Sequence, residues 1–248
     1  MASWIVHLRI AELLLEKIPG LDPSSFAVGN IAPDSGMPDE KWETFTPPTE
    51  VTHIIPERGS NMCADLLFYR KYLVEDPLAH RRGEKDGKRA SFLWGYFSHL
   101  VTDNLWRVEI GLPTQEKYKE QFEADKDFIW EVKKDWYGLD FLYVREHPNS
   151  LFWRVFLNCS YNENYLDFLL IEGVQDRIRY IQDYYRRDDE KIEAALRRPF
   201  EYLSKQRMDR FVDEASDFLF RVYQNLVNEN SGQEMGPSGI LTAPPWFS

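Results

Sequence analysis

Apolar residues recur at helical spacing along most of this 248-residue chain. Near the amino terminus, Ile10, Ala11 and Leu14 fall on one stripe of a helix, charged residues fall on the other, and Ser3 is placed to cap it. The pattern predicts further helices from Ser60 to about Glu75, through 95–106 as far as Pro113, from Thr114 to about Trp136, and three or four more between 150 and 228, broken near Arg187 and Pro199. The predicted fold class is all-α.

Two segments interrupt this periodicity. Residues 18–59 hold many of the prolines and several glycines, which predicts a long loop between the first two helices and not a run of helices. Apolar residues such as Phe26, Ile31 and Trp42 indicate that the loop is ordered, and loops of this length in compact domains are usually functional or disordered. Residues 80–89, HRRGEKDGKR, are expected to form a solvated connector.

Composition favours one helical domain over residues 1–228. With 43% apolar and 15% aromatic residues, the chain is long enough to bury a large core. Residues 229–248 are rich in Gly, Pro and Ser, which predicts a flexible carboxy-terminal tail.

Charge and cysteine content limit which binding partners and which cell compartment we expect. The formal net charge is −11, so the overall field repels polyanions and we expect no long nucleic acid as a partner. Arg9 and Glu12 interrupt the first apolar segment, which therefore resembles an amphipathic helix more than a signal peptide, and no run approaches the roughly 18 apolar residues of a membrane span. Cys63 and Cys159 lack a C-x-x-C partner, which fits buried thiols in a reducing compartment; we expect the cytoplasm.

The stretch GYFSHLVTDNLW, residues 95–106, carries the first candidate chemistry. His99 and Asp103 lie four residues apart in an otherwise apolar helix, so an imidazole and a carboxylate share one face. Such a pair can supply two ligands to one metal ion. It can equally be a buried His–Asp hydrogen bond without a metal, and the pair alone does not decide between these readings.

Three other segments place metal-ligand types in unusual settings. His7 lies on the apolar stripe of the first helix, Asp34 lies in the tight turn GNIAPDSG, and His53 lies in the apolar stretch VTHII. Each one alone also has an ordinary structural explanation. Together with His99 and Asp103 they form a mixed nitrogen and oxygen set that suits zinc best, with iron or manganese as alternatives. His80 and His147 have polar neighbours and are expected on the surface.

The order of these motifs resembles the zinc-dependent phospholipase C family, whose fold is shared with fungal single-strand-specific nucleases. The resemblance covers roughly residues 3–110 and rests on the first-helix histidine followed by GNIAPDSG, THII and GYFSHLVTD. It implies an all-helical fold with a metal cluster in a cleft, and hydrolysis of phosphate esters by a metal-activated water. It also implies that Asp34, His53, His99 and Asp103 hold one zinc, while His7 and Asp103 help to hold a second, so that Asp103 bridges.

Two departures from that family pattern bear on the number of metals. Secreted members use the amine of an amino-terminal Trp as a ligand, whereas Trp4 here follows three residues. They also bind a third zinc through a His six residues after the bridging Asp, a position that is Glu109 in this chain. We therefore expect one or two ions, with Glu109 as an alternative ligand only if it points inward.

The resemblance implies an enzyme, a phospholipase C-like phosphodiesterase, in which Asp34 orients or deprotonates the attacking water or simply binds metal. Small phosphoesters, including phospholipid head groups, are the expected substrates. Two alternatives stay open: a phosphohydrolase of the HD type, although none of the five histidines is followed by Asp, and a non-catalytic protein in which metal staples the long loop to the helices.

Overall fold

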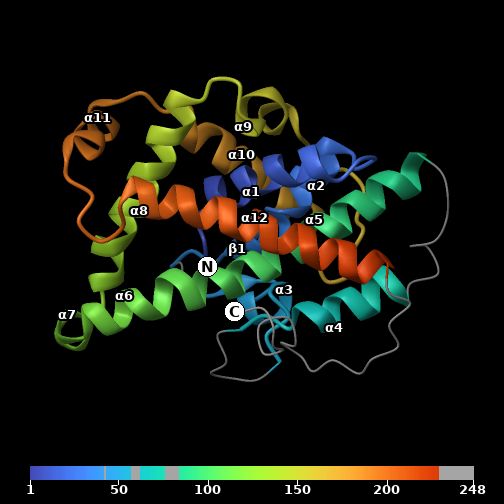
Figure 1. Ribbon diagram of the computed structural model, residues 1–248, viewed down its shortest axis with the longest axis horizontal. Helices are drawn as coiled ribbons and strands as arrows, with labels where there is room; N and C mark the ends of the chain where they lie inside the picture. Colours follow the sequence, from blue (N-terminus) through green and yellow to red (C-terminus); the bar gives the residue numbers. More distant parts are fainter. Residues whose placement is uncertain (42, 57–61, 76–83, 229–248) are drawn as a thin grey trace.

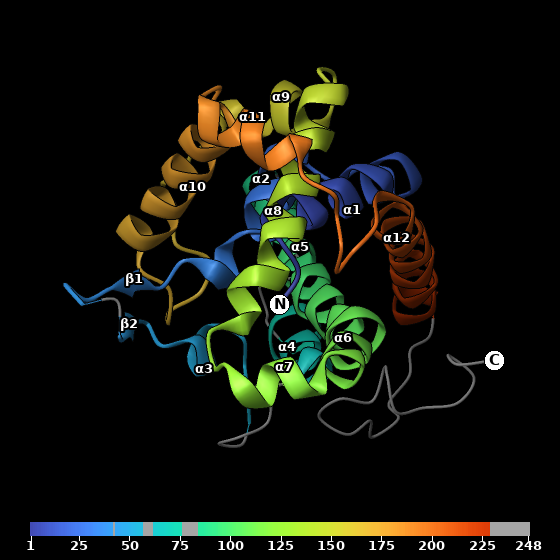
Figure 2. The same cartoon turned by 90° about the vertical axis from the view of Figure 1, so that its left-hand side faces the viewer.

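Helix α5 (Glu84–Trp106) runs from one side of the molecule into its interior (Figures 1 and 2). The computed structural model describes residues 1–41, 43–56, 62–75 and 84–228. Its other α-helices are α1 (Trp4–Lys17), α2 (Pro23–Gly29), α3 (Thr49–Thr52), α4 (Asp65–Tyr69), α6 (Leu112–Lys117), α7 (Lys119–Ala124), α8 (Phe128–Glu146), α9 (Leu151–Arg154), α10 (Ile171–Tyr185), α11 (Glu190–Arg197) and α12 (Lys205–Asn228). Helices α1, α2, α4 and α12 pack against α5. The prediction of an all-α fold is confirmed.

Short irregular elements join these helices. Segments η1 (Ala32–Asp34) and η4 (Phe156–Asn158) are 3-10 turns, and η2 (Arg70–Val74) and η3 (Arg107–Gly111) are π-helical. Strands β1 (Met37–Pro38) and β2 (Phe45–Thr46) pair antiparallel, with Met37 opposite Thr46. Figure 2 shows this hairpin projecting from one side of the helical body, near α3 and α10.

Helices α2 and α5 cross at backbone-to-backbone distance, and two glycines permit it. A Cβ added at Gly95 of α5 would come within 3.0 Å of the Phe26 carbonyl oxygen, and one added at Gly29 of α2 would do the same to the Phe92 carbonyl oxygen. Because neither residue has a Cβ, the end of α2 rests directly on α5. This contact fixes where the chain after Gly29 meets the centre of α5.

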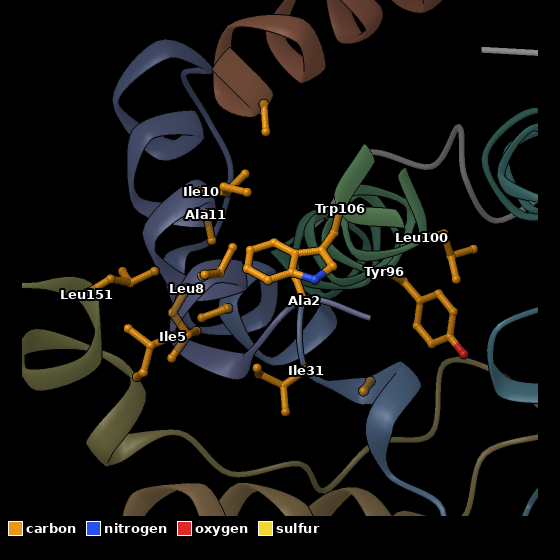
Figure 3. Close-up of a cluster of buried hydrophobic side chains, with 14 of the residues drawn as sticks. Ala2, Ile5, Leu8, Ile10, Ala11, Ile31, Tyr96, Leu100, Trp106 and Leu151 are labelled. Atoms are coloured by element: carbon orange, nitrogen blue, oxygen red, sulfur yellow. The ribbon is translucent and has the colours of Figure 1, made fainter. Parts of the chain in front are cut away.

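Helix α1 buries one face between α5 and the surrounding helices. Its apolar residues Ile5, Leu8 and Ile10 are almost fully buried, and Figure 3 shows Trp106 of α5 directed toward α1, beside Leu8. Ser3 occupies the N-cap position as predicted, but its hydroxyl donates to Asp140 Oδ1 at 2.7 Å and makes no capping bond within α1.

The predicted interruptions need two corrections. The region 18–59 is ordered where described, but it contains the short helices α2 and α3, so the expectation of a loop without helices was wrong. The N-cap Asp22, which accepts from Ser25 N at 2.8 Å, and Pro23 at the first turn begin α2. The expected connector 80–89 is helical from Glu84 onward, because the first turn of a helix can have the same polar composition as a loop. Its residues 80–83 lie outside the described part.

Helix boundaries after α5 also differ from prediction. Pro113 does not end a helix, because α5 continues through η3 into α6. Pro113 lies in the first turn of α6, where its missing backbone N–H removes little hydrogen bonding. The single helix predicted up to Trp136 is divided into α6, α7 and α8, and the turn before α8 is closed by Asp125, whose carboxylate accepts from Asp127 N at 2.8 Å. The breaks near Arg187 and Pro199 are confirmed.

The structure also bears on the predictions for the cysteines, the other histidines and the tail. Cys63 and Cys159 are buried free thiols, as expected. His147 is exposed, whereas His80, Trp42 and the tail 229–248 lie outside the described residues. Within the described residues, no helix combines the length and apolar character needed to cross a bilayer.

Candidate metal centre

Four separate elements deliver the five candidate residues to one point. His7 comes from α1, Asp34 from the end of η1, and His53 from the residue that caps α3, while His99 and Asp103 lie one turn apart on α5. All three histidines and Asp103 are buried, and Asp34 is 11% exposed. The structure therefore brings together every residue of the predicted set.

The donor atoms around His53 Nε2 are evenly spaced. His53 Nε2 lies 3.4 Å from Asp34 Oδ1 and 3.5 Å from Asp103 Oδ2, and 3.3 Å from His99 Nε2, which is itself 3.5 Å from Asp103 Oδ2. In a tetrahedral zinc site with bonds of about 2.0–2.1 Å, ligand atoms are separated by about 3.3–3.4 Å. Asp34, His53, His99 and Asp103 thus have the spacing of one coordination shell.

The other oxygen of Asp103 faces a second group. His7 Nε2 lies 3.4 Å from Asp103 Oδ1, which also accepts a hydrogen bond from the Ala2 backbone N–H at 2.8 Å. The rings of His7 and His99 are stacked, with centroids 3.9 Å apart. Asp103 therefore directs one oxygen to each group, which is the arrangement expected of a bridging carboxylate.

Some buried atoms of the cluster lack a hydrogen-bond partner and are placed to bind a metal. Both ring nitrogens of His7 and Oδ2 of Asp103 are buried without a hydrogen-bond partner. A buried polar atom that lacks a partner costs on the order of 1–3 kcal/mol, so such atoms are rare unless a ligand satisfies them. The chemistry of the donor set, three imidazoles and two carboxylates, fits zinc.

The protonation states of His7 and Asp34 suit metal binding. Burial, followed by the charge of neighbouring His99, lowers the pKa of His7 to about 4, so its imidazole is neutral near pH 7. Burial alone would raise the pKa of Asp34, but the hydrogen bond with His53 and the charge of His99 prevail and lower it. Neutral imidazoles and ionised carboxylates are the forms that bind metal. Burial alone would lower the pKa of His99, but the charge of Asp103 prevails and raises it, so a metal ion competes with a proton at this imidazole.

Hydrogen bonds orient His99 and its neighbours in the cluster. His99 Nδ1 lies 2.8 Å from the carbonyl oxygen of Asn30, which immediately follows α2. Since a carbonyl only accepts, Nδ1 carries a proton, and in the neutral imidazole Nε2 presents its lone pair to the cluster. The Tyr96 hydroxyl of α5 donates to the carbonyl of Thr52, next to His53. The close packing of α2 on α5 thus determines the geometry of the cluster.

Trp4 is a site residue that sequence reasoning missed in this role. Its indole N–H donates to Asp34 Oδ2 at 2.9 Å, which leaves Oδ1 to face His53. The beginning of α1 is held in turn by Asp140, which accepts from Ser3 and, at 2.5 Å, from the Tyr185 hydroxyl. No spacing rule in the sequence links Trp4 to Asp34, because the contact depends on how α1 docks.

Two cavities reach the cluster. One of about 430 Å³ borders Asp34 and His53, and one of about 300 Å³ borders His53 and Asp103. Phe45 lines the first cavity and Trp106 the second. Phe92 and Tyr96 of α5 line neither cavity and are buried in the core, where Phe92 stacks on Tyr161 and Tyr96 on Phe68.

Glu109, the alternative ligand, lies away from the cluster. Its side chain is exposed and pairs with Arg207 at 3.0 Å. The inward-pointing alternative is therefore wrong, and the residue serves as a surface ion-pair partner.

The fold and this cluster define an all-α protein with a histidine and carboxylate centre able to hold metal ions. The model of the family described as zinc-dependent phospholipase C matches residues 6–217. The chain belongs to the zinc-dependent phospholipase C family, and its match extends well beyond the segment that carries the sequence resemblance. Searches among curated proteins and among solved structures found no match.

Proposed function

We propose that this protein hydrolyses small phosphodiesters of the phospholipid head-group type, with His7, Asp34, His53, His99 and Asp103 holding one or two zinc ions. The observation that carries the proposal is the shell of donor atoms, spaced 3.3–3.5 Å apart, at the edge of a cavity. Membership of a zinc-dependent phospholipase C family supports metal-dependent cleavage of phosphate esters.

Bound zinc supplies Lewis acidity, which makes water nucleophilic near neutral pH and offsets charge on the phosphoryl oxygens. Asp34 is the proposed catalytic residue. It borders the larger cavity, its lowered pKa keeps it ionised, and Trp4 fixes one of its oxygens. An ionised, oriented carboxylate at this position can align a water for attack.

The two cavities suit the two sides of a phosphodiester. The larger one borders both Asp34 and His53, and we assign the head group to it. The smaller one is bounded by apolar side chains, among them Trp106, Phe122 and Trp136, and we assign the apolar leaving group to it. Met1 lines both cavities.

Asp34→Asn tests the proposed role, with Asp39→Asn as its control. Asp39 is an exposed aspartate just beyond β1 that accepts hydrogen bonds from Thr44 and Glu43, outside both cavities. With zinc-loaded protein and a small chromogenic phosphodiester, we expect Asp34→Asn to lose about 10²–10⁴ in turnover. Asp39→Asn should stay within about twofold.

Zinc content separates the two roles of Asp34. Turnover lost with zinc retained assigns proton transfer or water alignment, because the remaining donors still hold the metal. Turnover and zinc lost together assign a ligand role. Unchanged turnover in Asp34→Asn, or zinc-loaded wild type that cleaves no phosphate ester, would contradict the proposal and favour a metal-stapled binding protein.

We further propose that the protein acts in the cytoplasm, since Cys63 and Cys159 are separate buried thiols. Fractionation of the source cells tests this. Recovery from the medium or the cell envelope would contradict it.

A further inference from the structure

The larger cavity holds two cations that the proposed chemistry does not use. Lys133 of α8 and Arg177 of α10 line it together with Asp34, the one carboxylate among the described residues of its wall. The chain as a whole has 41 acidic and 30 basic residues. The described wall of this cavity therefore carries more positive than negative side chains, whereas the whole chain is acidic.

Neither cation has a carboxylate partner among the described residues. The Lys133 ammonium lies over the Trp130 ring, 4.6 Å from its centroid, and forms no ion pair there. Its neighbour Lys134, by contrast, is exposed and pairs with Glu131. Burial lowers the pKa of Lys133, a cost that an anion in the cavity would offset.

Arg177 is only partly satisfied. One terminal nitrogen donates to the Gly36 carbonyl at 3.4 Å, while its Nε is buried without an acceptor. Its exposed neighbour Arg179 pairs with Asp176 on the outside of α10. Of these two arginines on one helix, the one that faces the cavity has a buried donor without an acceptor.

The aromatic lining shows which ligand charge does not fit. The Arg177 guanidinium lies 5.3 Å from the centre of the Trp4 ring and 5.8 Å from that of Tyr180. Recognition of a quaternary ammonium such as choline needs free aromatic faces. Here the protein's own cation already occupies these faces, so a second positive charge would be repelled.

We propose that Lys133 and Arg177 form an anion subsite beside the metal centre, and that the substrate carries a second negative group, phosphate or carboxylate, next to the scissile phosphate. This inference rests on the proposed function. It makes the two cations the residues that select an anionic over a cationic head group.

Three small phosphate esters that differ only at the far end test the subsite. Phosphoglycolate carries a carboxylate there, ethylene glycol bisphosphate a phosphate, and phosphocholine a trimethylammonium. Calorimetric titration of zinc-loaded protein should give at least about tenfold tighter binding for the anionic probes than for phosphocholine, since a hydrogen bond to a charged group contributes about 1.5–3 kcal/mol. The stronger of the two anionic probes identifies the second group.

Matched variants assign the preference to these residues. Arg177→Gln and Lys133→Gln should each lose about tenfold in affinity for the anionic probes with little change for phosphocholine. Arg177→Lys should keep part of the preference because it keeps the charge. The controls Arg179→Gln and Lys134→Gln, on the same helices but outside the cavity, should bind all probes within about twofold of wild type.

The outcomes separate this inference from the proposed function. Equal loss for all three probes in Arg177→Gln would mean that the cations hold the scissile phosphate and would overturn the subsite. Tighter binding of phosphocholine by wild type would also overturn it, even if phosphodiesters are cleaved. Charge-selective binding without hydrolysis of the nitrophenyl esters of these compounds would retain the subsite and refute the proposed function.

Discussion

Substitution of the two glycines of α5 by alanine should change stability in opposite directions. Gly95 faces α2, and a Cβ there would lie within 3.0 Å of the Phe26 carbonyl oxygen and 3.1 Å from Asn30 N. Gly87, in the first turn of the same helix, has nothing within 4 Å of such a Cβ. The pair therefore compares one substitution in one helix with and without the α2 contact.

The magnitude follows from two opposing effects. Replacing a helical glycine by alanine increases the free energy of unfolding by about 0.5–1 kcal/mol, because alanine has the higher helix propensity and restricts the unfolded chain. At Gly95 the two backbones must separate by on the order of 1 Å to restore van der Waals distance, and overpacking of this kind costs about 1–3 kcal/mol. Because the obstacle is backbone and not a flexible side chain, we expect the upper end, a net loss of about 2 kcal/mol.

Thermal unfolding followed by circular dichroism in excess chelator measures this effect without a contribution from zinc. For a chain of this size, Gly95→Ala should lower Tm by about 4–8 °C, and Gly87→Ala should raise it by up to about 4 °C. Zinc affinity should also fall in Gly95→Ala by about 10–100-fold, because the Asn30 carbonyl that orients His99 moves with α2. A Gly95→Ala protein as stable as Gly87→Ala would refute the packing argument.

Three further predictions concern the cluster and its substrates. Asp103→Asn should lose more zinc and more turnover than His7→Asn, because Asp103 faces both donor groups and His7 only one; equal losses, measured by elemental analysis and rate, would argue against bridging. In metal-free protein, His7 has a pKa of about 4 when folded and about 6.5 when unfolded, so between these values the unfolded chain binds more protons. The contribution of His7 to the free energy of unfolding should therefore be present above about pH 6.5 and be lost as the pH falls toward 4. Urea titrations of wild type and His7→Asn should show a stability difference with this pH dependence, and a difference that does not change with pH would contradict the prediction. With net charge −11, the protein should cleave small phosphodiesters much faster than long single-stranded DNA or RNA, and faster polynucleotide cleavage with a steep salt dependence would reverse this prediction.

The long helices were predictable because each buries one stripe of apolar residues, which recur at helical spacing in the sequence. Periodicity located α1, the second half of α5, and the helices after residue 150 on the correct segments. It could not place boundaries where local hydrogen bonding decides them, as at Asp125, where a side-chain turn divides α7 from α8. The helix α2 was missed although its signal was present, since Asp22 followed by Pro23 is a helix start.

The candidate site was predictable to a different extent. The spacing of His99 and Asp103 on one helix predicted their shared face, but the approach of His7 and Asp34 depends on how separate elements dock, and only the family resemblance supplied it. The cations Lys133 and Arg177 gave no signal, because a lysine or arginine on an amphipathic helix is ordinarily solvated. Their meaning depends on the cavity that α8 and α10 form with the start of α1.

The metal content of the purified protein, combined with its stability on chelation, tests the central claim most directly. Elemental analysis should find one or two zinc ions per chain, and removal with chelator should lower Tm, because the buried atoms of His7 and Asp103 lose their partner. Return of zinc should restore Tm in wild type and not in Asp103→Asn. A protein isolated without metal, whose Tm is unchanged when zinc is added, would contradict the account.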